Sequence, residues 1–279
     1  DVIVASASGL SVIAVATLIA GLAALLGISR SLLAVYAKTA GRRRDRRARL
    51  ARLGTGAHLS FFEAILGEPP AMRRSLTSGH TECIFVDREY YVQTISDGDG
   101  TVLAFSVTTR NRRFRPTYEV PFRPGYVERR RLKRRFNYTY VPSVSVALGR
   151  STFASLDPTD PDRFAGPHYK VSVGAHNWTY SEFHPLGNPG YYQTVVLTAS
   201  DVAAQAPYGN AWNVQEELGG SEWPDPTRSE DQPRWGDLSA AHQFRQETVI
   251  TTYTVVRDLS LEDYPASFGP QLHIVRTLP

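Results

Sequence analysis

One stretch of this chain carries residue types that could form a metal site. His176, Glu182 and His184 lie within nine residues of one another, and imidazoles with a carboxylate are ligands that Zn²⁺ takes in hydrolytic sites. A metal-dependent hydrolase that uses the 176–184 loop is therefore one hypothesis. A further ligand is needed, however, and Asp201 is the nearest candidate. We favour a structural role for these residues and expect neither a metal nor another cofactor.

His80, Glu82 and Cys83 form a second polar group, and Cys83 paired with a distant histidine is one hypothesis for a thiol nucleophile. Cys83 is the only cysteine, which excludes an intramolecular disulfide and suits a reducing compartment. The sequence has no G-x-S-x-G, P-loop, G-x-G-x-x-G or H-E-x-x-H motif. We therefore predict no catalytic residue, and expect Cys83 to pack inside a strand.

A group of aromatic residues around the sequence Asn-Pro-Gly is the favoured binding site. A tight turn that presents tyrosine and tryptophan side chains offers large contact area at a small entropic cost. The alternative is that these aromatic rings point into the core. The predicted binding residues are Trp178, Tyr180, Asn188, Tyr191 and Tyr192.

The elements that would hold these residues follow an uncharged N-terminal segment. No charged residue occurs from Val2 to Ser29, and about 20 apolar residues suffice to cross a bilayer. Residues 1–30 are therefore predicted to form one transmembrane helix. A secretory signal peptide fits less well, because the apolar run is long and its basic flank follows it.

A cluster of arginines follows this segment and sets the expected topology. Arginines beside a span stay cytoplasmic, so we expect a single-pass protein whose soluble domain faces the cytoplasm. Residues 31–54 are predicted to form a basic helix on anionic headgroups, with nucleic-acid binding as the alternative. The membrane-surface residues are Arg42, Arg43, Arg44, Arg46, Arg47, Arg49 and Arg52.

The predicted fold class is α+β: after the transmembrane helix, residues 55–279 form antiparallel sheet with short helices. Alternating β-branched and aromatic residues occupy 81–95 and 101–109. Between them, Asp97–Gly100 predicts a β-hairpin with a primed turn and a positive φ at Gly98.

Other patterns concern the organisation of the soluble domain. Residues 58–66 have the pattern of a short amphipathic helix followed by glycine. Similar Tyr-x-Gln-Thr sequences at 91–94 and 191–194 leave open a degenerate repeat. In that case the domain contains two related lobes, at 55–140 and 141–279.

Several stretches spread over nearly the whole chain are shared with a known family. They are Arg43–Leu53, Leu59–Phe62, Leu66–Pro69, Tyr91–Thr109, Gly187–Thr194 and Phe268–Pro270. The chain resembles an uncharacterised family of bacterial single-span membrane proteins with an ETEC-type domain, most closely at the last three stretches. The resemblance implies a bacterial plasma-membrane protein of actinobacterial type, with no assigned activity and no catalytic residue.

Charge is unevenly distributed along the chain. Residues 1–52 and 53–150 carry net charges of +7 and +6, whereas residues 151–279 carry −9. A basic part beside an anionic leaflet and an acidic distal part argue against nucleic acid as the partner. We therefore expect a membrane-anchored cytoplasmic binding or scaffolding module without catalytic activity, whose partners are anionic headgroups and a protein.

Overall fold

The computed structural model describes residues 36, 40–111, 113–121, 143–157, 168–173, 178–185, 193–200, 239–257 and 269. The chain divides into two compact units, Asp1–Ala51 and Arg52–Pro279. In the first unit, residues 40–50 form a helix. The second unit contains every strand named below.

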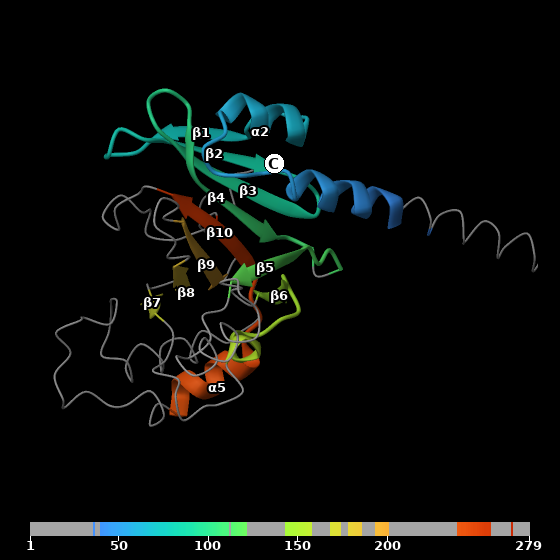
Figure 1. The fold of residues 1–279 in the computed structure, drawn as a ribbon, viewed down its shortest axis with the longest axis vertical. Coiled ribbons are helices and arrows are strands. Elements are labelled where there is room, and N and C mark those ends of the chain that lie inside the picture. The colour runs from blue at the N-terminus through green and yellow to red at the C-terminus, as the bar shows by residue number, and fades with distance from the viewer. Residues whose placement is uncertain are drawn as a thin grey trace, which may run out of the picture. The chain divides into compact units, whose positions relative to one another are not determined.

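One antiparallel sheet of eight strands is the main element of the second unit, in the order β1-β2-β3-β4-β10-β9-β8-β7 (Figure 1). Consecutive pairing along β1 to β4 makes one meander, and pairing along β7, β8, β9 and β10 makes another. The two meanders join where β4 pairs with β10. The strands are β1 Met72–Ser75, β2 Thr81–Val86, β3 Tyr90–Ser96, β4 Val102–Thr109, β7 His168–Val173, β8 Trp178–Pro185, β9 Gln193–Ser200 and β10 Thr252–Arg257.

The remaining named elements are short. A two-stranded sheet pairs β5 (Thr117–Pro121) with β6 (Ser143–Ala147). The helices are α2 (Leu59–Leu66), the 3₁₀ helix η1 (Phe153–Leu156) and α5 (Ser239–Glu247). The helix predicted at 58–66 is confirmed as α2, which ends at Gly67 in the left-handed conformation.

The hairpin predicted around Asp97–Gly100 is also confirmed, because β3 pairs with β4. The positive φ predicted at Gly98 is wrong: Gly100 has a φ of 83° instead. The Gly100 N–H donates to the Asp97 carbonyl (3.1 Å), and the Asp97 N–H donates to the Thr101 carbonyl (3.0 Å). This is a type I turn followed by a left-handed residue, one residue longer than the expected primed turn.

The two faces of the eight-stranded sheet differ in chemistry. Side chains alternate along a strand, and the register places Phe105, Tyr180 and Tyr253 on one face, called here the aromatic face. α2, β5 and η1 each place an aromatic ring on it. The pairs are Phe62 with Phe105 (5.8 Å between ring centroids), Tyr118 with Tyr253 (4.1 Å) and Phe153 with Tyr180 (4.9 Å).

The opposite face, called here the hydroxyl face, carries paired serines and threonines beside a small apolar cluster. Gly269 lies against it: its N–H donates to Gln93 Oε1 (2.7 Å). A Cβ at Gly269 would lie 2.8 Å from Thr108 Oγ1, so only glycine fits this close approach. The hydroxyl pairs are Ser106–Thr254 and Thr108–Thr252 (2.8 Å each) and Ser181–Thr198 (2.9 Å).

The predicted fold class is wrong. The described chain is mostly antiparallel sheet with few helices. Among the described residues, no helix is both long and apolar enough to cross a membrane. Residues 1–30, where the transmembrane helix was predicted, lie outside that part. The strand content was underestimated because segments such as β7 and β8 mix Lys, Glu and His with strand formers, and only pairing with neighbours makes them strands.

Candidate functional site

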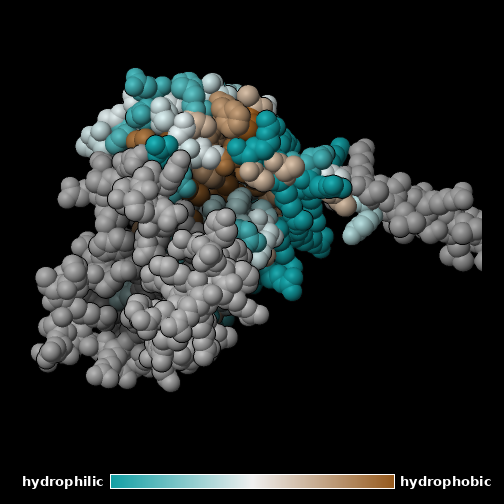
Figure 2. All heavy atoms as spheres, viewed as in Figure 1, coloured by the Kyte–Doolittle hydropathy of each residue, from teal (hydrophilic) through white to brown (hydrophobic). Residues whose placement is uncertain are grey.

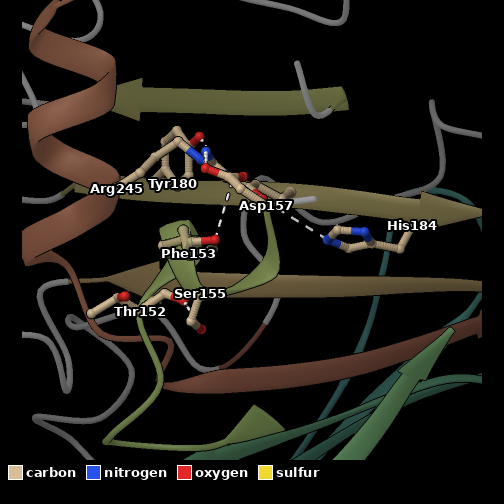
Figure 3. Close-up of polar contacts among 8 residues, drawn as sticks. Thr152, Phe153, Ser155, Asp157, Tyr180, His184 and Arg245 are labelled. Atoms are coloured by element: carbon tan, nitrogen blue, oxygen red, sulfur yellow. Dashed lines mark hydrogen bonds and ion pairs between the residues drawn. The ribbon is translucent and has the colours of Figure 1, made fainter. Parts of the chain in front are cut away.

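A buried arginine near the end of α5 organises a cluster of polar side chains (Figure 3). Arg245 binds two carboxylates and one carbonyl. Its Nε donates to Glu182 Oε1 (2.5 Å) and its Nη2 to Glu182 Oε2 (3.3 Å). Its Nη1 donates to Asp157 Oδ2 (2.8 Å) and its Nη2 to the Phe153 carbonyl (3.2 Å). The hydroxyl of Tyr180 donates to Glu182 Oε1 (2.9 Å).

Three elements bring these groups together. On α5, Arg245 lies on the same buried side as Ala241 and Phe244, which is the spacing of one helix face. On β8, Tyr180 and Glu182 are two residues apart and therefore share the aromatic face. Asp157 follows η1 directly, so three segments distant in sequence converge on one guanidinium.

The electrostatics of the cluster show what burial does to each group. Burial raises the pKa of Glu182, against the opposing effect of Arg245. Burial lowers the pKa of Arg245, but the charge of Glu182 and its hydrogen bonds to Asp157 and Glu182 outweigh that effect, so its pKa is raised. Burial also raises the pKa of Tyr180 well above its ordinary value, with the Glu182 charge acting in the same direction. Tyr180 therefore stays a neutral donor.

The arrangement is suited to holding elements together. The exposed fractions of the Arg245 and Glu182 side chains are 1% and 0%, so neither can reach a substrate in solution. Both carboxylate oxygens of Glu182 already accept from Arg245. A general base or a metal ligand needs an available lone pair directed at its target. The carboxylate of Glu182 is instead held in the ion pair with Arg245.

Of the residues proposed as metal ligands, the structure describes Glu182 and His184. His176 lies outside the described residues. His184 Nε2 is 3.9 Å from Glu182 Oε2, but Glu182 is bound to Arg245. The part of the chain that the structure describes contains no group of three His, Cys, Asp or Glu side chains able to hold a metal ion.

The second polar group is divided between the two faces of β2. Glu82 and Cys83 are adjacent in the strand, so their side chains point in opposite directions. Cys83 is fully buried, and burial raises the pKa of its thiol, which disfavours a thiolate nucleophile. His80 Nδ1 lies 2.8 Å from Ser78 Oγ. The three residues therefore do not form a common site.

Glu82 is a second buried carboxylate, on the hydroxyl face. Gln93 Nε2 donates to Glu82 Oε1 (2.5 Å), and Arg74 Nε donates to Glu82 Oε2. Gln93 in turn accepts from the Gly269 N–H. The two faces of the sheet thus each contain a buried glutamate neutralised by an arginine, here through a chain that extends to Gly269.

Two of the predicted aromatic binding residues belong to the core. Trp178 and Tyr180 are 3% and 0% exposed, and both rings pack against Phe244 of α5. Neither ring is available as a binding anchor at the surface, which is a correction to the sequence-based prediction for these two residues. Asn188, Tyr191 and Tyr192 lie outside the described residues.

The predicted arginine surface is partly built into a helix. In residues 40–50, the arginines at every third position from 43 are half-buried, whereas Arg42, Arg44 and Arg47 are exposed, as is Arg52 beyond the helix end. Hydrophilic side chains cover the part of this helix seen in Figure 2. The half-buried arginines are Arg43, Arg46 and Arg49.

Sequence reasoning missed Arg245, although a signal was present. Arg245 follows Ala241 by four positions and Phe244 by one, so it interrupts the apolar side of a short amphipathic helix. A charge at such a position requires a buried partner. What the sequence did not contain was the identity of the partners, because Asp157 and Glu182 are distant along the chain.

Comparison with known proteins identifies no relative of this chain. No family model, no curated protein and no solved structure matches the chain. The resemblance to bacterial proteins with an ETEC-type domain therefore stays a prediction.

Proposed function

We propose that this protein is a non-catalytic binding module that attaches to anionic lipid headgroups through the helix at residues 40–50. The observation that carries the proposal is the charge of this helix. It contains six arginines and one aspartate. Exposed arginines on several sides of one helix suit a surface of distributed phosphates better than a single small ligand.

The sequence around the helix favours lipid over nucleic acid as the source of phosphate. The adjoining segment from Val2 to Ser29 has no charged residue, and apolar sequence beside a basic cluster is typical of proteins at a membrane surface. Residues 151–279 carry a net charge of −9, which would repel a polyanion that extended beyond the helix.

The absence of catalysis in the proposal has its own support. Glu182, the central residue of the hydrolase hypothesis, is neutralised by Arg245 and has no exposed surface. Cys83 is buried with a raised pKa. Glu182 therefore serves in an ion pair, and Cys83 serves in core packing.

The expected strength of headgroup binding follows from the exposed arginines. Each basic residue near an anionic leaflet contributes about 1 kcal/mol at best. Replacement of Arg42, Arg44 and Arg47 by glutamine should therefore weaken binding by about 3 kcal/mol, or roughly two orders of magnitude. Screening by salt should reduce the effect, because the Debye length is about 8 Å at physiological ionic strength.

The test is co-flotation of the full chain with lipid vesicles that contain either phosphatidylserine and phosphatidylcholine or phosphatidylcholine alone. We expect stronger, salt-sensitive association with the anionic vesicles, and loss of that preference in the triple glutamine variant. A matched control removes the same charge elsewhere, with glutamine at the exposed Arg110, Arg113 and Arg150.

Equal association of the wild-type chain with both kinds of vesicle would refute headgroup binding. Equal loss of the preference in the control variant would show that net charge, and not this helix, is responsible. A short duplex DNA that displaced the chain from anionic vesicles at equimolar phosphate would favour the nucleic-acid alternative.

A further inference from the structure

β1 is the last described strand on its side of the sheet. Among the described strands, β1 pairs with β2 alone and therefore ends the sheet on that side. Ala71, Arg73 and Ser75 are exposed. The backbone of an edge strand presents N–H and C=O groups that another strand can pair with.

The direction of the backbone donors follows from the hairpin that joins β1 to β2. The Leu76 N–H donates to the His80 carbonyl (2.7 Å), so it points toward β2. Donors alternate along an antiparallel strand. The N–H groups of Arg73 and Ser75 therefore point away from β2, toward the open side of the sheet.

β1 carries two arginines, and each of them meets a glutamate of the chain itself. Arg73 Nη2 binds Glu63 Oε1 of α2 at 3.1 Å, and the two side chains are 56% and 35% exposed. An ion pair this exposed contributes little to stability and can exchange for another carboxylate. Arg74 uses its Nε on Glu82 and is 40% exposed, and a guanidinium has five N–H donors.

These charges select against a second copy of the chain as the added strand. β1 reads Met-Arg-Arg-Ser. A two-fold antiparallel pairing centred on Arg73 or Arg74 sets that arginine opposite its own copy, and like charges directly opposite are unfavourable. An acidic strand would instead place a carboxylate opposite each guanidinium, and such a pair is favourable.

We propose that the β1 edge binds an extended acidic segment of a partner protein as an added strand. The segment carries two consecutive carboxylate residues, one opposite Arg73 and the other opposite Arg74. Its backbone pairs with the outward N–H and C=O groups of Arg73 and Ser75, as in other complexes formed by strand addition. The site is independent of the headgroup surface proposed for the helix at residues 40–50.

The test measures binding of a fluorescent peptide to the full chain by anisotropy. The peptide alternates Val and Thr on both sides of a central Glu-Glu pair. A second peptide has the same sequence and charge but is N-methylated at alternate amides, which prevents backbone pairing. We expect saturable binding of the first peptide and at least about tenfold weaker binding of the second, because two ladder hydrogen bonds are lost.

Protein variants locate the site. Ser75→Pro removes an outward N–H without removing a donor to β2, and proline is tolerated on that side of an edge strand. We expect it to lose peptide binding while Ser75→Ala retains it. The variant with glutamine at Arg42, Arg44 and Arg47 should bind the peptide as the wild type does, so failure of either proposal is distinguishable from failure of the other.

Amide hydrogen exchange gives a readout that requires no variant. The N–H groups of Arg73 and Ser75 should exchange more slowly in the presence of the peptide. Equal affinity for the two peptides, or no saturable binding of the Glu-Glu peptide, would overturn the proposal. Unchanged exchange at Ser75 in the peptide-saturated chain would overturn it as well.

Discussion

The buried ion pair between Arg245 and Glu182 makes a quantitative prediction about stability. Arg245→Met removes the cation and leaves Glu182 buried with Tyr180 as its remaining hydrogen-bond donor in the cluster. Removal of one partner from a buried pair costs about 3–5 kcal/mol. We expect the same range for Glu182→Leu, because Arg245 then loses its fully buried counter-charge and retains the more exposed Asp157.

The double variant should be much less destabilised than the sum of the two single variants. Replacing a buried pair with apolar side chains of similar volume is often close to neutral. A residual cost of about 1–3 kcal/mol is expected, because the buried hydroxyl of Tyr180 loses its acceptor. The coupling energy between the two sites should therefore be about 3 kcal/mol or more, well above the roughly 0.5 kcal/mol within which independent sites add.

The measurement is urea unfolding of the full chain and the three variants, followed by tryptophan fluorescence. Trp178 packs against Phe244 beside Arg245, so its emission reports on this part of the fold. Adding Tyr180→Phe to the double variant should recover part of the residual cost. Additive effects of the single variants would refute the reasoning, because they would mean that the two charges do not interact.

Two further predictions concern a turn and a tyrosine. Gly100→Ala should cost about 1–3 kcal/mol, because φ is 83° there and the new Cβ would lie 2.6 Å from His58 Nε2. Gly98→Ala is the matched control, since nothing lies within 4 Å of a Cβ at that position; equal thermal midpoints for the two variants would contradict the assigned turn. Burial raises the pKa of Tyr253 to about 12 from 10.0, a difference worth at most about 3 kcal/mol. The folded state keeps the proton longer, so this stability is present below pH 10 and is lost as the pH rises toward 12. Tyr253→Phe should therefore unfold with a shallower pH dependence in that window, and identical slopes for variant and wild type would count against the raised pKa of Tyr253.

The local elements were predictable because their signals are local. The helix α2 is specified by its apolar spacing and by Gly67, and the β3–β4 hairpin by alternation on both sides of Asp97. The position of the left-handed residue in this hairpin was not predictable. It depends on the Asp97 side chain, whose Oδ1 accepts from the N–H groups of Asp99 and Thr101. These bonds belong to a longer turn than the dipeptide Asp-Gly by itself predicts.

The roles of the polar residues were mostly not predictable. Glu182 and His184 share metal-ligand spacing in the sequence, yet in β8 the carboxylate is committed to Arg245 from another element. Trp178 and Tyr180 have the composition of binding anchors, but burial against α5 makes them core residues. The residue type limits which interactions a side chain can make, and its neighbours in the fold determine which of them it does make.

By itself, the sequence determined the arginine-rich helix, the short helix at 58–66 and the hairpin around Asp97. Each depends on residues within a few positions of one another, where propensity and periodicity act. Only the tertiary structure decided that β4 pairs with β10, that the two meanders form one sheet, and that each face holds a glutamate bound by an arginine. Those contacts join residues that are distant in sequence. They follow from the total burial and charge pairing of the folded chain, which no local window of sequence contains.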